Sequence, residues 1–437
     1  MHFSRTIQVV AVVLLGILVL SPAHATTINI PADYLTIAEG LAATAPGDTV
    51  LVAPGIYLEQ PLVMSVGVCL RGATGDPAEV VIDAQRQGRV LTCTYLDDPV
   101  RIEDLTLTGG FTTMENTDSA MAGGLLLKST YAEVRNCRVI DNEAELEGGG
   151  LFFDLESNGL ISGCLVAGNI SIDGPGIGCR ASSPLVENCV IANNDGVVWG
   201  GALFCRTGSN PRVVGCTMVG NDAHFGSGIW AVDGPDIVVE NSIIAFGIHG
   251  EGIFAYDNPS LPSDIRLVCC NVFGNQGGGY GGTSPDQTGI DGNIAVDPLF
   301  CDVENLDFTL AADSPCLPEN NSCNIQMGAL GQGCNATSGV AGELPSVTRL
   351  VKIMPNPFNP RTIVRFENGE AGHVQLEVFD LAGRRVARIF AGWLEAGIHE
   401  KTINGRDTSG RSLAAGQYVV RLKTSAGMDV QKVILAK

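Results

Sequence analysis

The stretches VENCVIANN at residues 186–194 and VVGCTMVGN at residues 213–221 follow one pattern, and this pattern decides the fold. An apolar residue is followed three positions later by Cys or Ser, two positions after that by a second apolar residue, and usually three further on by Asn. Six segments share the pattern, centred on Cys137, Cys164, Cys189, Cys216, Ser242 and Cys270, and the centres advance by 25 to 28 residues. Repetition at such a period indicates a repeat architecture.

The two apolar positions of each segment are five residues apart, so a straight strand would place them on opposite faces. The backbone must therefore bend between them. A strand, a corner and a second strand, repeated about every 26 residues, predict one coil of a parallel β-solenoid, which is stable only when coils stack. We expect Asn142, Asn169, Asn194 and Asn221 to form an amide ladder. We expect the Cys column to be buried free thiols, because in-register parallel strands disfavour the disulfide torsion.

Composition and charge limit the possible classes of protein. The 437 residues include 55 Gly and carry a net charge of −21, with 45% apolar residues scattered along the chain. This excludes a disordered chain and a polytopic membrane protein, and it argues against nucleic acid as a partner. The charge is uneven: residues 347–437 have a balance of +6 and the preceding residues −27. The asymmetry predicts two separate units.

The N-terminus predicts export from the cytoplasm. Met1–Arg5 is a short basic segment, Val9–Leu20 is apolar, and Ala23–Ala25 has the small residues that signal peptidase requires. We expect residues 1–25 to be a signal peptide and the mature chain to be secreted, extracellular or at the cell surface, with no transmembrane span. Disulfides are permitted there. Four cysteines in a strand-poor stretch are expected to form two disulfides of undetermined pairing: Cys301, Cys316, Cys323 and Cys334.

The repeats resemble the right-handed parallel β-helix of the pectate-lyase-like superfamily over residues 27–334. Asp33–Ala45 has apolar residues at helical spacing and resembles the helix that caps such solenoids. Gly47–Tyr57 is similar to a first-coil strand of bacterial members, and Asp297–Phe300 to their closing segment. The resemblance implies an all-β domain over residues 26–334. It leaves the activity open, because lyases, hydrolases, esterases, epimerases and adhesins share the scaffold.

Residues 335–346 read as a linker, and residues 347–437 as an immunoglobulin-like β-sandwich. Six strands are expected, at Thr362–Phe366, Val374–Phe379, Val386–Phe390, Ile398–Ile403, Gln417–Leu422 and Val430–Leu435. Asn356–Pro360, Val378–Arg384 and Ala415–Tyr418 resemble type IX secretion sorting domains and, equally, the domain of flagellar hook-capping proteins. The sorting resemblance implies the outer-membrane secretion machinery as a partner. The alternative is a plain spacer domain.

Strand alternation predicts a ligand-binding stripe. Leu125, Leu151, Ile177, Leu203 and Ile229 lie 26 residues apart and form the expected inward column. The next position then points outward, and so does the position two further on. These positions supply the candidate binding residues Phe152, Phe204, Trp230, Tyr256, Asp154, Arg180 and Arg206, suited to a polysaccharide or cell-surface glycan. Two alternatives stay open: a loop or second chain covers the stripe and the charges form an ion-pair ladder, or a bulge turns the aromatics into the core.

A catalytic set is not recognisable. Asn116–Asp118 matches one signature of polygalacturonase-type hydrolases, whose other signatures are not found in order downstream. The leading hypothesis is therefore non-catalytic binding of an extended glycan, with a polysaccharide lyase or hydrolase as the alternative and a structural adhesin or spacer as the second. The acidic loop at residues 141–147 offers oxygen ligands for Ca²⁺ but is typical of a solvated turn, so no metal or cofactor is expected.

Overall fold

The computed structural model describes residues 25–115, 120–256, 258–335 and 349–436, the last range with gaps at 369–371, 382, 395–396, 408–410 and 425–426. Residues 1–24 of the expected signal peptide, most of the 335–346 linker and all of the Asn116–Asp118 match lie outside these residues. The chain divides into two compact units, one up to residue 336 and one from residue 337. Within the described ranges, no helix has the length and apolarity to cross a membrane.

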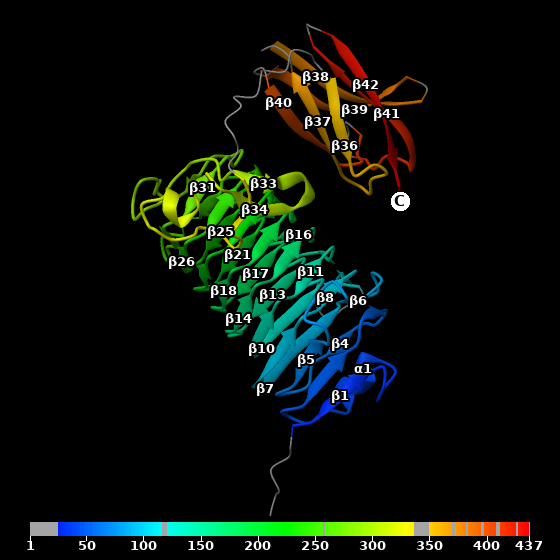
Figure 1. Ribbon diagram of the computed structural model, residues 1–437, viewed down its shortest axis with the longest axis vertical. Helices are drawn as coiled ribbons and strands as arrows, with labels where there is room; N and C mark the ends of the chain where they lie inside the picture. The colour runs from blue at the N-terminus through cyan, green and yellow to red at the C-terminus, as the bar shows by residue number, and fades with distance from the viewer. Residues whose placement is uncertain are drawn as a thin grey trace, which may run out of the picture. The chain divides into compact units, whose positions relative to one another are not determined.

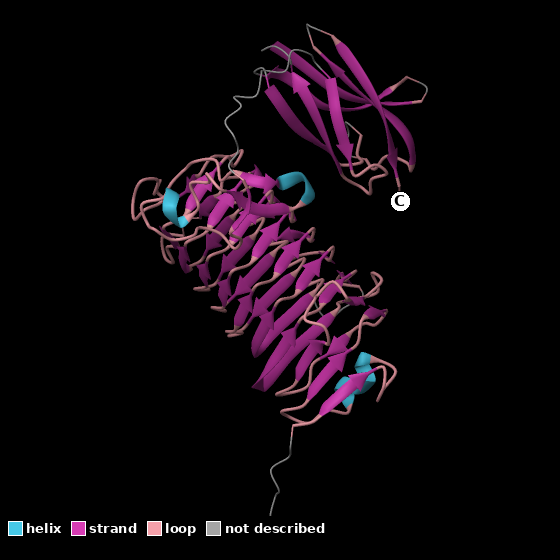
Figure 2. Ribbon diagram, viewed as in Figure 1, coloured by secondary structure: helices cyan, strands magenta, loops and turns pink. Residues whose placement is uncertain are grey.

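The first unit is a parallel β-solenoid (Figures 1 and 2). Its largest sheet contains β1 (Thr27–Ile30), β2 (Thr49–Val52), β4 (Leu62–Val63), β5 (Cys69–Gly72), β7 (Leu91–Glu103), β10 (Leu125–Arg135), β13 (Leu151–Asp154), β14 (Leu160–Ser162), β17 (Ile177–Arg180), β18 (Leu185–Glu187), β21 (Leu203–Arg206), β22 (Arg212–Val214), β25 (Ile229–Val232), β26 (Asp236–Glu240), β29 (Ile253–Ala255), β30 (Asp264–Val268) and β32 (Tyr280–Gly282). The second contains β3 (Gly55–Tyr57), β6 (Val80–Asp83), β8 (Thr106–Thr108), β11 (Arg138–Ile140), β15 (Leu165–Ala167), β19 (Val190–Ala192), β23 (Thr217–Val219), β27 (Ile243–Ala245) and β31 (Asn271–Phe273). The third contains β9 (Phe111–Thr112), β12 (Glu143–Ala144), β16 (Ile170–Asp173), β20 (Asp195–Trp199), β24 (Asp222–Ala223) and β28 (Ile248–His249).

The predicted bend lies between the two apolar positions of each repeat. The residue before the Cys or Ser adopts a left-handed conformation in successive coils, at Asn136, Gly163, Asn188, Gly215 and Asn241, with φ between 47° and 63°. Gly, and to a lesser degree Asn, tolerate this conformation. Each corner lets the chain leave one sheet and enter the next while both apolar side chains point inward.

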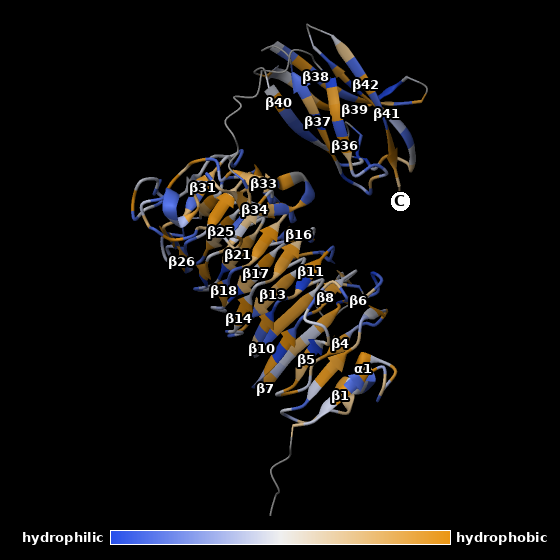
Figure 3. Cartoon of the chain, viewed as in Figure 1, coloured by the Kyte–Doolittle hydropathy of each residue, from blue (hydrophilic) through white to orange (hydrophobic). Residues whose placement is uncertain are grey.

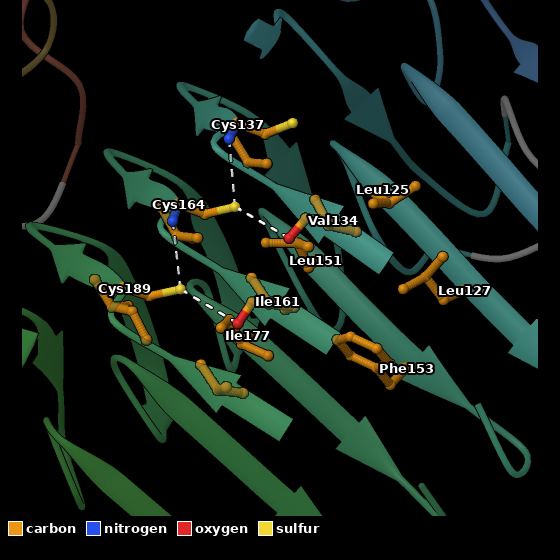
Figure 4. Close-up of a cluster of buried hydrophobic side chains, with 14 of the residues drawn as sticks. Leu125, Leu127, Val134, Cys137, Leu151, Phe153, Ile161, Cys164, Ile177 and Cys189 are labelled. Carbon is orange, nitrogen blue, oxygen red and sulfur yellow. Dashed lines mark hydrogen bonds between the residues drawn. The ribbon is translucent and has the colours of Figure 1, made fainter. Parts of the chain in front are cut away.

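Apolar side chains fill the interior, as the close-up in Figure 4 shows. Many strands of the solenoid are coloured as hydrophobic in Figure 3. The expected inward column from Leu125 to Ile229 is fully buried. The Cys column is confirmed as buried free thiols. These thiols link neighbouring coils: the backbone N–H of Cys137 donates to Sγ of Cys164 at 3.4 Å, and Sγ of Cys164 donates to the carbonyl of Val134 at 3.5 Å.

The predicted amide ladder is also present and buried. Nδ2 of Asn142 donates to Oδ1 of Asn169 at 3.1 Å, Asn169 donates to Asn194 at 2.9 Å, and Asn194 donates to Asn221 at 2.9 Å. Each accepting Oδ1 also receives the backbone N–H of the preceding Asn. Gly247 replaces Asn in one coil and interrupts the side-chain ladder, although its backbone N–H still donates to Oδ1 of Asn275 at 2.9 Å.

Both ends of the solenoid are closed. Helix α1 (Ile37–Ala42) is shorter than the Asp33–Ala45 expected, because Thr36 and Glu39 form a capping box that starts the helix at residue 37. At the other end lie β33 (Phe300–Asp302), β34 (Asp307–Ala311) and β35 (Gln332–Cys334), with 3₁₀ turns η1 (Val303–Asn305) and η2 (Pro318–Asn320). Phe308 packs there against Val190 and Val219 on the outer face of the second sheet.

Two disulfides close the C-terminal cap, as expected, but the prediction of which four cysteines form them is wrong for one residue. Cys301 is bonded to Cys334, whereas Cys323 is bonded to Cys269 of the last complete coil. Cys316 is a free thiol, buried against Met327 and Leu317. Cys269 occupies the left-handed corner with φ of 52°, which separates its side chain from the buried Cys column and leaves it able to reach Cys323.

The second unit consists of two antiparallel sheets around one apolar core. One sheet contains β36 (Arg349–Met354), β37 (Thr362–Asn368) and β40 (Gly397–Ile403), and the other contains β38 (Gly372–Asp380), β39 (Arg385–Leu394), β41 (Gly416–Lys423) and β42 (Met428–Leu435). The six predicted strands are present. Edge strand β36 is not among the predicted strands, because alternation does not reveal it: its buried residues, Leu350 and Ile353, are three positions apart.

Candidate functional site

Three columns of side chains lie outside the solenoid interior along β13, β17, β21 and β25. The aromatic column contains Leu126, Phe152, Gly178, Phe204 and Trp230, which are partners in strand register. The charged column contains Lys128, Asp154, Arg180 and Arg206. The rim column contains Met121, Glu147, Asp173, Trp199 and Phe225, which bridge one another from coil to coil. Each coil therefore contributes one residue to each column, and Val232 ends the charged column.

A glycine follows each rim residue from Glu147 to Phe225 and turns the chain back towards the aromatic column. Gly226 has φ of 61°, and a Cβ atom there would lie 2.9 Å from Cβ of Trp230. Gly148 is equivalent, with a hypothetical Cβ 2.7 Å from Cβ of Phe152. A larger residue would clash at both positions. The glycines thus allow the aromatic side chains to lie directly beneath the turn.

The expectation of an exposed aromatic stripe is wrong for three of its residues. Phe152, Phe204 and Trp230 are only 0%, 2% and 3% exposed. Alternation itself holds, because the flanking residues line the interior, but the turn after the rim column covers these rings. Trp230 stacks on Phe204 at 5.0 Å and on Trp199 at 5.2 Å between ring centroids. The rings therefore form a covered stack outside the main core.

Tyr256 was assigned to the wrong column. It is 55% exposed, but the register partner of Trp230 is Phe254. This coil has 24 residues rather than 26, so a fixed period overshoots by two positions. Tyr256 keeps the predicted exposure and lies beyond the end of β29, away from the register of the aromatic column.

The charged column forms ion pairs between coils. Nε and Nη2 of Arg180 donate to Oδ1 and Oδ2 of Asp154 at 2.6 and 2.7 Å, and Nζ of Lys128 lies 3.9 Å from Oδ2. Asp154 is buried, and these two cations are the partners of its carboxylate. Arg206 instead reaches across an entire coil to Oε1 of Glu147 at 2.6 Å. These contacts match the alternative of an ion-pair ladder.

Glu147, which is partly buried, and Asp173, which is buried, are neighbouring carboxyl groups in the rim column. Burial raises the pKa of Glu147, against the opposing charges of Arg206 and Arg180. Burial and the charge of Glu147 raise the pKa of Asp173 to about 7. Oδ1 of Asp173, Nε of Arg206 and Nε1 of Trp230 are buried without a hydrogen-bond partner. Near neutral pH this site can therefore hold both a protonated and an ionised carboxyl group.

Four residues of this site are not among those predicted from the sequence: Glu147 as a member of a column, Asp173, Trp199 and Phe225. Trp199 and Phe225 are 38% and 36% exposed, in contrast to the buried aromatic column. Their spacing could have revealed this column, because successive rim residues are 26 positions apart. A constant spacing is hard to recognise in a sequence when the residues that share it are of different types.

The acidic loop at residues 141–147 does not converge on one point. Glu143 pairs with Arg86 at 2.7 Å, Glu145 accepts from the backbone of Met114 at 3.0 Å, and Glu147 pairs with Arg206. In the part of the chain that the structure describes, no three His, Cys, Asp or Glu side chains are grouped to hold a metal ion. Each acidic side chain of this loop thus has a separate environment.

Comparison with known proteins identifies the fold of both units. Residues 123–295 match the family model of the right-handed beta helix region. The solenoid is a right-handed β-helix. Residues 358–427 match the FlgD Ig-like domain, so the second unit is immunoglobulin-like. No curated protein gives a significant match.

Solved structures resemble the β-helix only distantly. Pectin methylesterase PemA from Erwinia chrysanthemi aligns over 62% of this chain and 92% of its own, with 13% identity and a TM-score of 0.36. A pectin methylesterase in complex with a hexasaccharide aligns over 65% and 95%, with 14% identity and a TM-score of 0.35. Bacteriophage CBA120 tailspike protein 4 aligns over 89% and 64%, with 9% identity and a TM-score of 0.26. At this similarity, any function must be argued from the site itself.

Proposed function

We propose that the protein is exported and that its β-helix binds a neutral polysaccharide along the rim column without cleaving it. The observation that carries this proposal is the position of Trp199 and Phe225 on adjacent coils, both partly exposed, with Trp199 backed by the buried ring of Trp230. Adjacent coils place the backbones of these two residues about 4.8 Å apart, so their side chains can offer apolar surfaces to consecutive sugar rings. Glu147 and Asp173 continue the same column and supply hydrogen-bonding groups next to the aromatics.

The charge of the β-helix favours a neutral ligand. Residues before 347 carry a balance of −27, and the cations of the charged column are already paired with Asp154 and Glu147. A polymer of uronic acids would be repelled by this field. The expected ligand is therefore an uncharged glycan chain rather than pectate.

Direct binding to a panel of neutral glycans tests the proposal. Trp199→Ala and Phe225→Ala are each expected to weaken binding roughly tenfold, because each removes a stacking surface. Tyr131→Ala is the matched control, since Tyr131 is an exposed aromatic residue on β10 outside the three columns. Unchanged affinity in both rim variants would refute the proposal and favour a structural spacer.

A second candidate is acid-assisted cleavage at the same site, favoured by the raised pKa of Asp173 beside Glu147. A group that donates a proton must be protonated, so turnover would fall as the pH rises through about 7. Assays of glycan cleavage with the parent protein and with Asp173→Asn separate the two candidates. Sustained product formation that Asp173→Asn abolishes would replace the binding proposal.

The immunoglobulin-like unit is proposed to act in delivery to, or attachment at, the outer cell surface. The support is the resemblance of its Asn356–Pro360 and Ala415–Tyr418 motifs to type IX sorting domains, together with the N-terminal signal pattern. Removing residues 347–437 in a bacterium with that secretion system should leave the β-helix in the periplasm. Normal surface delivery of the truncated chain would indicate a spacer instead.

A further inference from the structure

The outer face of the four-stranded sheet in the immunoglobulin-like unit is rich in cations. Val374, Leu376 and Val378 of β38 point into the core, so the alternate residues of β38 and their register partners lie on the opposite face. The basic residues on that face are Arg385, Arg388, Arg421, Lys423 and Lys432. They come from three of the four strands and span the width of the sheet.

A single carboxylate, Glu377, lies beneath three of these arginines. It accepts hydrogen bonds from Arg421 at 2.6 Å, from Arg385 at 2.7 Å and from Arg388 at 3.4 Å. Burial opposes ionisation, but the hydrogen bonds from Arg421 and Arg385 outweigh it, and the pKa of Glu377 lies below its ordinary value. Glu377 is therefore ionised at neutral pH and offsets one of the positive charges.

The remaining charge on this face is not balanced. Lys423 and Lys432 are exposed, and neither has a carboxylate partner among the described residues. Nε of Arg421 is buried and lacks a hydrogen-bond partner, although Nη2 binds Glu377. Five cations over one carboxylate leave a net charge of +4 on one sheet face, while the β-helix is strongly acidic.

We propose that this cationic face is a second binding site, which takes an acidic polysaccharide through its carboxylate or sulfate groups. Guanidinium groups recognise such oxyanions with paired hydrogen bonds, and lysines at the edge add longer-range attraction. Recognition by charge dominates around Arg421, because its guanidinium lies 4.3 Å from the centroid of the Phe379 ring and covers that ring. The proposal does not depend on the rim column and assigns the two units opposite ligand preferences.

Binding of the full-length protein to immobilised polygalacturonate and heparin tests this assignment. The net charge of +4 on this face predicts that affinity falls roughly 50-fold when NaCl rises from about 50 to about 200 mM, by analogy with counterion release on single-stranded polyanions. The double variant Lys423→Gln and Lys432→Gln leaves a net charge of +2 and should reduce this salt effect to roughly 7-fold and weaken binding at low salt. Both lysines are exposed, so folding is expected to be intact and is checked by thermal denaturation.

The matched control is Lys401→Gln with Arg266→Gln, which removes the same charge from other faces of the chain. Loss of acidic-glycan binding in the Lys423 and Lys432 variant alone supports the proposal. An equal loss of binding in the control would show that only the net charge of the chain matters, and would overturn the proposal. Absence of binding to either polymer, or tighter binding to DNA than to both polymers, would overturn it as well. Neutral-glycan binding should be unchanged in both variants, so failure here is distinguishable from failure of the rim-column proposal.

Discussion

Replacing Asp173 by Asn should stabilise the β-helix at high pH and have little effect at low pH. The pKa of Asp173 is about 7 in the folded protein, against an ordinary value of 3.8. An acid whose pKa is raised by folding opposes folding once it ionises, so the penalty is absent below about pH 4, grows up to about pH 7 and is constant above. At 1.36 kcal/mol per pKa unit the full penalty is about 4 kcal/mol, an upper limit because Glu147 relaxes when its neighbour is neutral.

Thermal unfolding measured from pH 4 to pH 8 checks this reasoning. We expect Asp173→Asn to raise the Tm by roughly 5–10 °C at pH 8, with the difference from the parent shrinking towards zero at pH 4. Asp236→Asn removes a charge from an exposed residue of the same β-helix and should show no such trend. A stabilisation of equal size at both ends of the pH range, or a lower Tm at pH 8, would show that burial beside Glu147 does not govern the ionisation of Asp173.

Four further predictions concern the scaffold. Asn194→Ala should lower the free energy of unfolding by roughly 2–4 kcal/mol in chemical denaturation, because it leaves buried ladder partners unsatisfied; a loss below 1 kcal/mol would contradict the ladder's role. Gly226→Ala should cost about 1–3 kcal/mol, since a Cβ there clashes and φ is positive, and a neutral effect would show that the turn can relax. Cys189→Ser should be tolerated, as Ser242 is in the same column, whereas reduction of Cys301–Cys334 should increase proteolysis of the C-terminal cap before the coils unfold.

The repetitive part of the fold could be predicted from the sequence because each coil imposes the same requirements. Burial at Val134 and Val139, a left-handed corner at Asn136 and an amide at Asn142 recur every 25 to 28 residues, and each requirement selects a residue type. The ends could not be predicted in this way. The pairing of Cys269 with Cys323 depends on a fold-back of the chain that occurs once and leaves no periodic signal.

The site could be predicted only in part, because inward and outward are not the only environments around a coil. Alternation correctly placed Phe204 and Trp230 outside the interior, but it carries no information about the glycine turn that covers them. Local coil length was also decisive: two residues fewer between Trp230 and Phe254 moved Tyr256 out of the column. Glu147 and Asp173 become a pair only through the stacking of two coils.

The bridge from Arg206 to Glu147 spans 59 positions and passes over the coil that carries Asp173. Most other side-chain contacts of the three columns join immediate neighbours, so gain or loss of a whole coil elsewhere along these columns by gene duplication or excision would leave those contacts intact. Within residues 147–206 that freedom is lost, since a changed number of coils would separate the two ends of this bridge. Homologues that vary in length are therefore expected to do so outside this interval.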